Sequence, residues 1–115
     1  MMIQIYHNPR CKKSRAGLQH LQQKGVEFEL VEYLKNGISE KEVKTILTKL
    51  NAEPLDMIRT QEEKYKKEFK GKNFTREEWI KIMAENPALI KRPMVVKGYK
   101  AVWADPPEEM DILFK

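Results

Sequence analysis

The sequence predicts an α/β fold in which helices flank one mixed sheet. Three observations lead to this prediction: strand and helix patterns alternate over residues 1–33, helix signals dominate residues 39–90, and a hairpin with a following helix start ends the sequence. A strand, a helix and a second strand form a right-handed parallel unit. The hairpin adds antiparallel strands, so the predicted order is β-α-β, a helical middle and β-β-α.

The first part of the chain predicts the parallel unit. Residues 3–6 alternate between apolar and polar side chains, which is typical of a short strand. Asn8-Pro9 predicts a turn, and the apolar residues of 12–25 then recur at helical spacing up to a glycine. Residues 26–33 alternate less regularly and predict the second strand.

The middle of the chain carries three capping-box patterns, in which Ser or Thr precedes Glu by three residues and predicts a helix start. They lie at residues 39–42, 60–63 and 75–78. The second helix is expected to run as far as Lys70, and residues 55–58 are expected to form a short helical turn that leads to Arg59. Asn86-Pro87 ends the third helix, and a further turn follows it.

The last part predicts a β-hairpin, because apolar residues 94–96 and 99–103 flank a Lys-Gly turn. Asp105-Pro106-Pro107 then begins a helix. This order suits a thioredoxin-like architecture in which the segment of about 39–90 is inserted between two halves of a single domain, residues 1–115. In such a fold the Arg92–Pro93 peptide is expected to be cis and to lie beside the loop that holds Cys11.

Composition limits the kind of protein. The 115 residues are 41% hydrophobic and 34% charged, as in a globular domain with its own core. There is no membrane-length apolar run and no targeting pattern, and only one cysteine is present, so we expect a cytoplasmic protein without a membrane partner. The sequence contains no Cys/His cluster, so we expect no structural zinc site. The net charge of +5 is a mild bias toward anionic partners, and it is not evidence for nucleic-acid binding because acidic residues are interleaved with the basic ones.

The most informative residue is Cys11, which stands where the first helix begins. Backbone N–H groups and the helix dipole favour an anion there, and basic residues at positions 10, 12, 13 and 15 add positive charge. A free thiol titrates near pH ~8.5, and such surroundings lower that value by one to several units. A lone cysteine is often a small buried hydrophobe, but flanking by Arg10 and Lys12 favours a reactive thiolate.

Residues 6–15 resemble the active-site loop of the glutaredoxin-linked arsenate reductase family. Further resemblance lies at residues 32–35, 58–59, 86–87 and 90–96. The resemblance implies a thioredoxin-like fold with a helical insertion, attack of Cys11 on arsenate, and binding of the oxyanion by Arg59 and Arg92. Because the chain has no second cysteine, it also implies an external reductant, glutathione with glutaredoxin or another thiol, and no bound cofactor.

Supporting or substrate-binding roles are expected for His7, Asn8, Lys12, Ser14, Arg15 and Pro93. The residues themselves leave two of these roles open. His7 either tunes the thiol or is a satisfied histidine at the sheet edge, and Ser14 either bonds the thiolate or is a plain first-turn residue. His20 is expected at the surface, and Trp79 and Trp103 in the core.

Two departures from the family pattern keep other functions open. The reductases carry a third arginine where this chain has Asp105, although Lys100 could supply charge. Relatives of the Spx type, which are transcription regulators, often carry a second cysteine where this chain has Ser14. The leading hypothesis is an arsenate reductase-like thiol enzyme. The alternatives are a regulator that binds RNA polymerase and a glutathione-dependent thiol reductase with another substrate.

Overall fold

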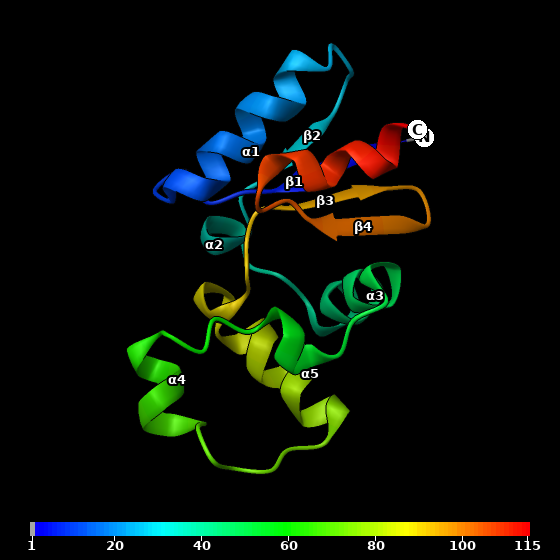
Figure 1. Ribbon diagram of the computed structural model, residues 1–115. Coiled ribbons are helices and arrows are strands. Elements are labelled where there is room, and N and C mark those ends of the chain that lie inside the picture. Colours follow the sequence, from blue (N-terminus) through cyan, green and yellow to red (C-terminus); the bar gives the residue numbers. More distant parts are fainter. Residues whose placement is uncertain (1) are drawn as a thin grey trace.

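A mixed sheet lies at the centre of the fold (Figure 1). The computed structural model describes residues 2–115. The strands are β1 (Ile3–Tyr6), β2 (Glu29–Val31), β3 (Met94–Lys97) and β4 (Lys100–Trp103), in the spatial order β2-β1-β3-β4. β1 pairs in parallel with β2, whereas the β1–β3 and β3–β4 pairs are antiparallel. The predicted mixed sheet is therefore confirmed, with the N-terminal strand inside it.

One face of the sheet is covered by α1 (Lys12–Gln23) and by the 3-10 helix η3 (Pro107–Phe114), which lie on the same side in Figure 1. The core between them and the sheet is small and apolar. Its buried members are Ile3, Ile5, Leu21, Val95, Ala104, Met110 and Leu113. The predicted C-terminal helix is thus present in the tighter 3-10 form.

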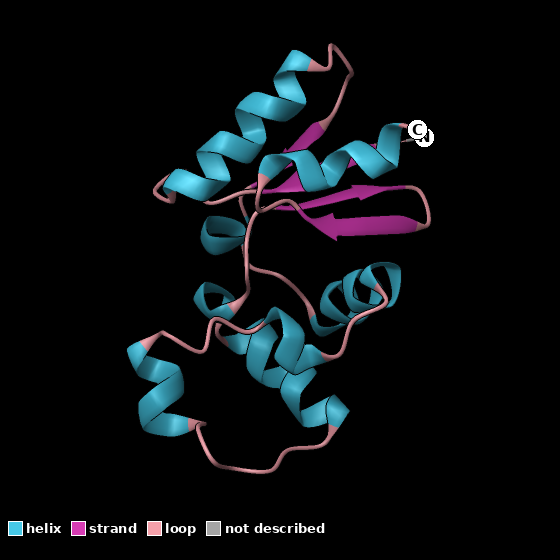
Figure 2. Cartoon of the chain, viewed as in Figure 1, coloured by secondary structure: helices cyan, strands magenta, loops and turns pink. Residues whose placement is uncertain are grey.

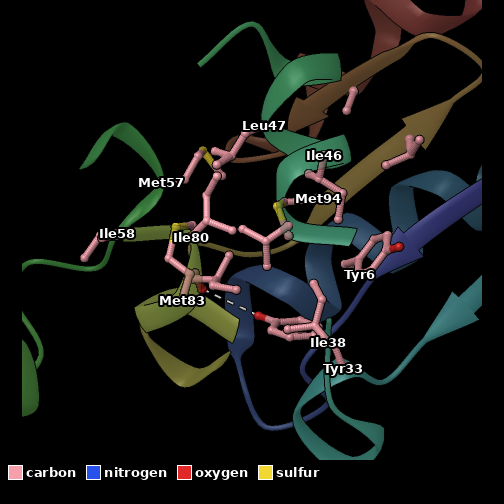
Figure 3. Packing of buried hydrophobic residues seen from close by; sticks show 14 of the residues in the cluster. Tyr6, Tyr33, Ile38, Ile46, Leu47, Met57, Ile58, Ile80, Met83 and Met94 are labelled. Carbon is pink, nitrogen blue, oxygen red and sulfur yellow. Dashed lines mark hydrogen bonds between the residues drawn. The ribbon is translucent and has the colours of Figure 1, made fainter. Parts of the chain in front are cut away.

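The opposite face is covered by the helical segment between the two halves of the sheet. Its α-helices are α2 (Tyr33–Asn36), α3 (Glu40–Leu50), α4 (Glu63–Glu68) and α5 (Arg76–Glu85) (Figure 2). The 3-10 turn η1 (Pro54–Met57) lies between α3 and α4, and the 3-10 turn η2 (Pro87–Leu89) lies between α5 and β3. Figure 3 shows the core on this face, where Tyr6 and Met94 of the sheet meet Ile46 and Leu47 of α3 and Met83 of α5. The predicted helical insertion is confirmed, and no helix within residues 2–115 is long and apolar enough to cross a membrane.

The two ends of the insertion are held together at its base. Ile58 and Ile90 form an antiparallel bridge. Arg59 N–H donates to the Leu89 carbonyl at 2.7 Å, and Lys91 N–H donates to the Met57 carbonyl at 2.8 Å. Residues 57–59 and 89–91 together form a neck between the insertion and the sheet. The neck places Arg59 beside the residues that lead into β3.

Local sequence patterns were reliable at two of the three capping boxes. Ser39 and Thr75 each accept the N–H of the glutamate three residues later, and the reciprocal bonds are present. The box predicted at Thr60 is wrong: α4 begins at Glu63 after Glu62, whose side chain makes no capping bond. The neck explains the difference, because Arg59 is fixed to Leu89 and its guanidinium pairs with Glu62 at 2.9 Å.

Two other expectations need correction. The second strand is confined to Glu29–Val31, because the chain turns at Glu32 and Tyr33 already begins α2. His20 is not a free surface residue: its Nε2 lies 2.8 Å from Asp111 Oδ1, and its side chain is only 25% exposed. This pair fastens α1 to η3 on the first face of the sheet.

Candidate active site

The loop between β1 and α1 is ordered by its own polar groups. His7 N–H continues the parallel ladder by donating to the Val31 carbonyl at 3.0 Å. Asn8 then closes a turn, because its side-chain oxygen accepts Arg10 N–H at 3.0 Å and its carbonyl accepts Cys11 N–H at 3.0 Å. The turn places Cys11 at the N-cap of α1 in extended conformation, as the sequence predicted.

The Ser14 side chain holds this loop through hydrogen bonds. Its hydroxyl is fully buried, lies 2.7 Å from His7 Nδ1 and accepts Asn8 N–H at 2.9 Å. The hydroxyl therefore serves the loop, while the Ser14 backbone N–H contributes to a lowered pKa of the Cys11 thiol. Burial lowers the pKa of His7 below its usual value, which favours a neutral imidazole that positions the loop through Ser14.

The Cys11 thiol is half-buried and poised to ionise. Burial is the strongest single influence and raises its pKa, but hydrogen bonds from Ser14 N–H, the Arg92 side chain and Lys13 N–H together lower the pKa below its ordinary value. The stabilising groups are two N–H groups in the first turn of a helix and one guanidinium, which is the pattern expected around a thiolate.

The thiol opens into a pocket of about 300 Å³. Its lining is mostly cationic and polar: Cys11, Lys13, Arg59, Thr60, Gln61, Lys91, Arg92, Trp103 and Asp105. The Arg92–Pro93 peptide is cis, as predicted. Pro93 is buried against α1 so closely that a Cβ on Gly17 would lie 2.5 Å from Pro93 Cγ. The packing of α1 on Pro93 therefore fixes Cys11 relative to Arg92.

The two arginines of the pocket are held differently. Arg92 Nη1 donates to the Ala88 carbonyl at 2.9 Å, and its Nε is buried without a hydrogen-bond partner. Arg59 Nη1 lies 2.9 Å from Glu62 Oε1. An unpaired buried N–H is costly, and this one belongs to an arginine that lines the same pocket as Cys11.

Two aromatic residues lie close to the arginines of the pocket. Tyr33 is fully buried, and burial raises its pKa to about 12 although Arg92 and Arg59 oppose this. Its hydroxyl lies 3.5 Å from the Ile90 carbonyl, the dashed line in Figure 3. Trp103 packs against the core, as expected, and also forms a half-buried wall of the pocket. Its Nε1 donates to the Arg92 carbonyl at 3.2 Å, and Lys91 Nζ lies 4.6 Å from its ring centroid.

The remaining predicted site residues lie outside this pocket. His7 and Asn8 line a separate hollow of about 400 Å³, together with residues 32, 34 and 35. Lys12 and Arg15 are exposed, and the Arg15 guanidinium donates to the Pro9 carbonyl at 3.0 Å. In their place Lys13 faces the pocket. Among residues 2–115, no group of three His, Cys, Asp or Glu side chains could hold a metal ion.

Comparison with known proteins places this geometry in a family. The model of the ArsC family matches residues 6–113. The chain belongs to the ArsC family. It is 36% identical over 111 residues to an arsenate reductase of Neisseria meningitidis, covering 95% of both chains, and 38% identical over 110 residues to one of Haemophilus influenzae, covering 94% of this chain and 95% of the relative.

Solved structures confirm the thioredoxin-like fold of this ArsC-family chain. It is similar to an arsenate reductase from Vibrio cholerae, with a TM-score of 0.89 and 37% identity over 95% of this chain and 94% of that chain. The likeness extends over almost the whole of both chains, so it includes the sheet and the helical segment between its two halves.

Asp105 is where this ArsC-family chain departs from the arginine implied by the resemblance. Its carboxylate lines the pocket and lies 3.1 Å from Lys13 Nζ. Lys100, considered as a substitute source of charge, lies in another hollow beside Tyr99 and Leu113. The pocket therefore combines four cationic side chains with one carboxylate.

Proposed function

We propose that this protein is an arsenate reductase-like thiol oxidoreductase in which the Cys11 thiolate attacks an arsenate-like oxyanion. The observation that carries this proposal is the shared pocket of Cys11, Arg59 and Arg92, in which the thiol has a lowered pKa and a buried Arg92 N–H has no partner. Relatives named arsenate reductases support the same substrate class.

The arginines address the main difficulty of this chemistry, which is that a thiolate and an oxyanion repel each other. Guanidinium groups offset that repulsion and offer paired donors to tetrahedral oxygens. Arg92 lines the pocket, and its side chain helps to lower the pKa of the Cys11 thiol there. Arg59 is placed to exchange part of its contact with Glu62 for the substrate, since the two groups are only partly buried.

The proposed reaction uses one protein thiol and external thiols. The Cys11 sulfur forms a bond to arsenic(V), and an arsenic-bound hydroxyl leaves as water after it takes up a proton. An external thiol then attacks the Cys11 sulfur, so a mixed disulfide forms and arsenic leaves as arsenite with the electron pair of the broken sulfur–arsenic bond. A second external thiol releases Cys11 and completes a disulfide between the two external thiols. Glutathione and glutaredoxin are the proposed donors, because Cys11 is the only cysteine of the chain.

The direct test is an arsenate reductase assay with glutathione and glutaredoxin, comparing the wild-type protein with Cys11→Ser. Arsenite formation that requires both the protein and Cys11 is expected. Reduction of a glutathione mixed disulfide without any arsenite formation would instead favour the thiol reductase hypothesis. Capture of RNA polymerase by a protein without either activity would favour the regulator hypothesis.

A second test measures the anion site without turnover. Titration calorimetry with arsenate is expected to show weaker binding by about tenfold or more for Arg92→Ala and Arg59→Ala, since each charge-assisted bond is worth ~1.5–3 kcal/mol. Arg76→Ala is the matched control, because Arg76 also pairs with a glutamate, Glu53 at 3.0 Å, but lies outside the pocket. Equal, negligible binding by all four proteins would refute the oxyanion site.

A further inference from the structure

We propose that Asp105 determines the charge of the substrate that this pocket accepts: its carboxylate makes the site prefer a singly charged over a doubly charged oxyanion. The inference rests on the proposed function, because it concerns the same anion site. It adds a residue whose role differs from that of the arginines, since Asp105 would repel the ligand instead of binding it.

Backbone hydrogen bonds hold the residue that carries this carboxylate at the edge of the pocket. Asp105 N–H donates to the Trp103 carbonyl at 3.0 Å, and the preceding Ala104 N–H donates to the Pro93 carbonyl at 2.9 Å. These bonds tie Asp105 to the strand end and to the proline that packs on α1. Its side chain is 20% exposed and lies 3.1 Å from Lys13 Nζ. The negative charge therefore lies at the wall of the pocket, paired with Lys13.

The charged groups that line the pocket together with Asp105 come from three parts of the chain. Lys13 and Cys11 come from the start of α1, Arg59 from the neck, and Lys91 and Arg92 from the segment before β3. Lys13 is positioned at the N-terminal turn of α1, where the helix dipole disfavours a cation, and Asp105 compensates it. A ligand oxyanion in the pocket meets this compensated pair, and the carboxylate repels each added negative charge.

The repulsion by Asp105 increases with the charge of the ligand, whereas the fit of a tetrahedral ligand in the pocket does not depend on that charge. A doubly charged oxyanion therefore loses more from Asp105 than a singly charged oxyanion of the same tetrahedral shape. Because Asp105 is partly solvated, we expect its effect to be about threefold per ligand charge, and thus about tenfold for a dianion. Arsenate exists in both charge states near neutrality, so this preference selects between two forms of one substrate.

The test uses protection of Cys11 from iodoacetamide, a neutral reagent, by inorganic phosphate or sulfate. Phosphate is mainly singly charged in mildly acidic solution and mainly doubly charged in mildly alkaline solution, whereas sulfate is doubly charged in both. The change in sulfate protection with pH therefore measures titration of the protein alone. The phosphate constant divided by the sulfate constant isolates the charge of the ligand.

In Asp105→Asn, protection by sulfate and by alkaline phosphate is expected to strengthen about tenfold, and protection by acidic phosphate only about threefold. Lys13→Met leaves the charge of Asp105 without its ion-pair partner, so protection by a dianion is expected to weaken. This change is opposite in direction to the one expected for Asp105→Asn. Asp111→Asn is the matched control, because Asp111 pairs with Lys24 at 2.8 Å away from the pocket, and its constants are expected to match the wild type.

Two results would overturn the inference, and they are distinguishable. If phosphate and sulfate protect neither wild type nor any variant, the oxyanion site itself is wrong and the role of Asp105 falls with it. If they protect the wild type but Asp105→Asn leaves the ratio between the two charge states unchanged, the oxyanion site stands and Asp105 does not select charge.

Discussion

The contact between Gly17 and Pro93 makes a prediction that links packing to the thiol. In Gly17→Ala the new Cβ would lie 2.5 Å from Pro93 Cγ, and its next neighbours, Pro93 Cβ and the Ala104 carbonyl oxygen, would be at 3.5 and 3.7 Å. Carbon atoms normally approach to about 3.5–4.0 Å. The methyl group therefore requires α1 and the proline to separate by about 1 Å, because the proline ring is not a flexible side-chain end.

The expected change in stability is the sum of two opposing effects. Overpacking costs about 1–3 kcal/mol, whereas replacing glycine by alanine inside a helix contributes about 1 kcal/mol of stabilisation. We expect Gly17→Ala to lose about 1 kcal/mol, which lowers the urea midpoint by about half a molar. The separation also moves Cys11 away from Arg92, so its pKa is expected to rise toward that of an unfolded thiol.

The assay combines urea unfolding with the pH dependence of Cys11 alkylation. Gln19→Ala is the control, because Gln19 lies on the exposed side of the same helix and its replacement is expected to change stability by less than about 0.5 kcal/mol. A Gly17→Ala protein that is more stable by the full propensity gain, with an unchanged alkylation midpoint, would show that α1 does not depend on this contact.

Three further predictions follow from other contacts. The alkylation midpoint of Cys11 is expected below that of the same chain unfolded in urea, because the lowered folded-state pKa keeps the thiolate populated at pH values where a free thiol is protonated; coincident midpoints would contradict this. Ser14→Ala is expected to cost about 1–3 kcal/mol in urea unfolding, because it leaves the buried Asn8 N–H without an acceptor; a cost near zero would mean that another group replaces the hydroxyl. Thr75→Ala is expected to cost about 1 kcal/mol through loss of its helix cap, whereas Thr60→Ala, which removes no cap, serves as its control; equal losses would contradict the assignment of the caps.

The elements that the sequence predicted well are those determined within a few residues. The Ser39 and Thr75 boxes form because each partner glutamate lies within one turn of the helix it caps. The same pattern at Thr60 fails because the neck, a contact between distant parts of the chain, fixes the backbone at Arg59 first. Tertiary contacts thus override a valid local signal at this position.

The residues of the candidate site also differ in how far the local sequence determines their positions. Cys11 could be placed at a helix start from the residues around it, because the turn and the helix are local. Arg92 could be placed beside it only through the fold. Trp103 could not be assigned to the pocket wall, because it reads as an apolar hairpin residue until the fold places Arg92 beside it.

The position of β1 inside the sheet has a consequence for the growing chain on the ribosome. β1 is made early, and its parallel partner β2 follows by Val31, but its antiparallel partner β3 exists only after residues 7–93 have been translated. At about 5–20 residues per second this interval lasts roughly 4 to 17 s. During that time one edge of β1 has no native neighbour, so the nascent chain depends on avoiding wrong strand pairing until its hairpin emerges.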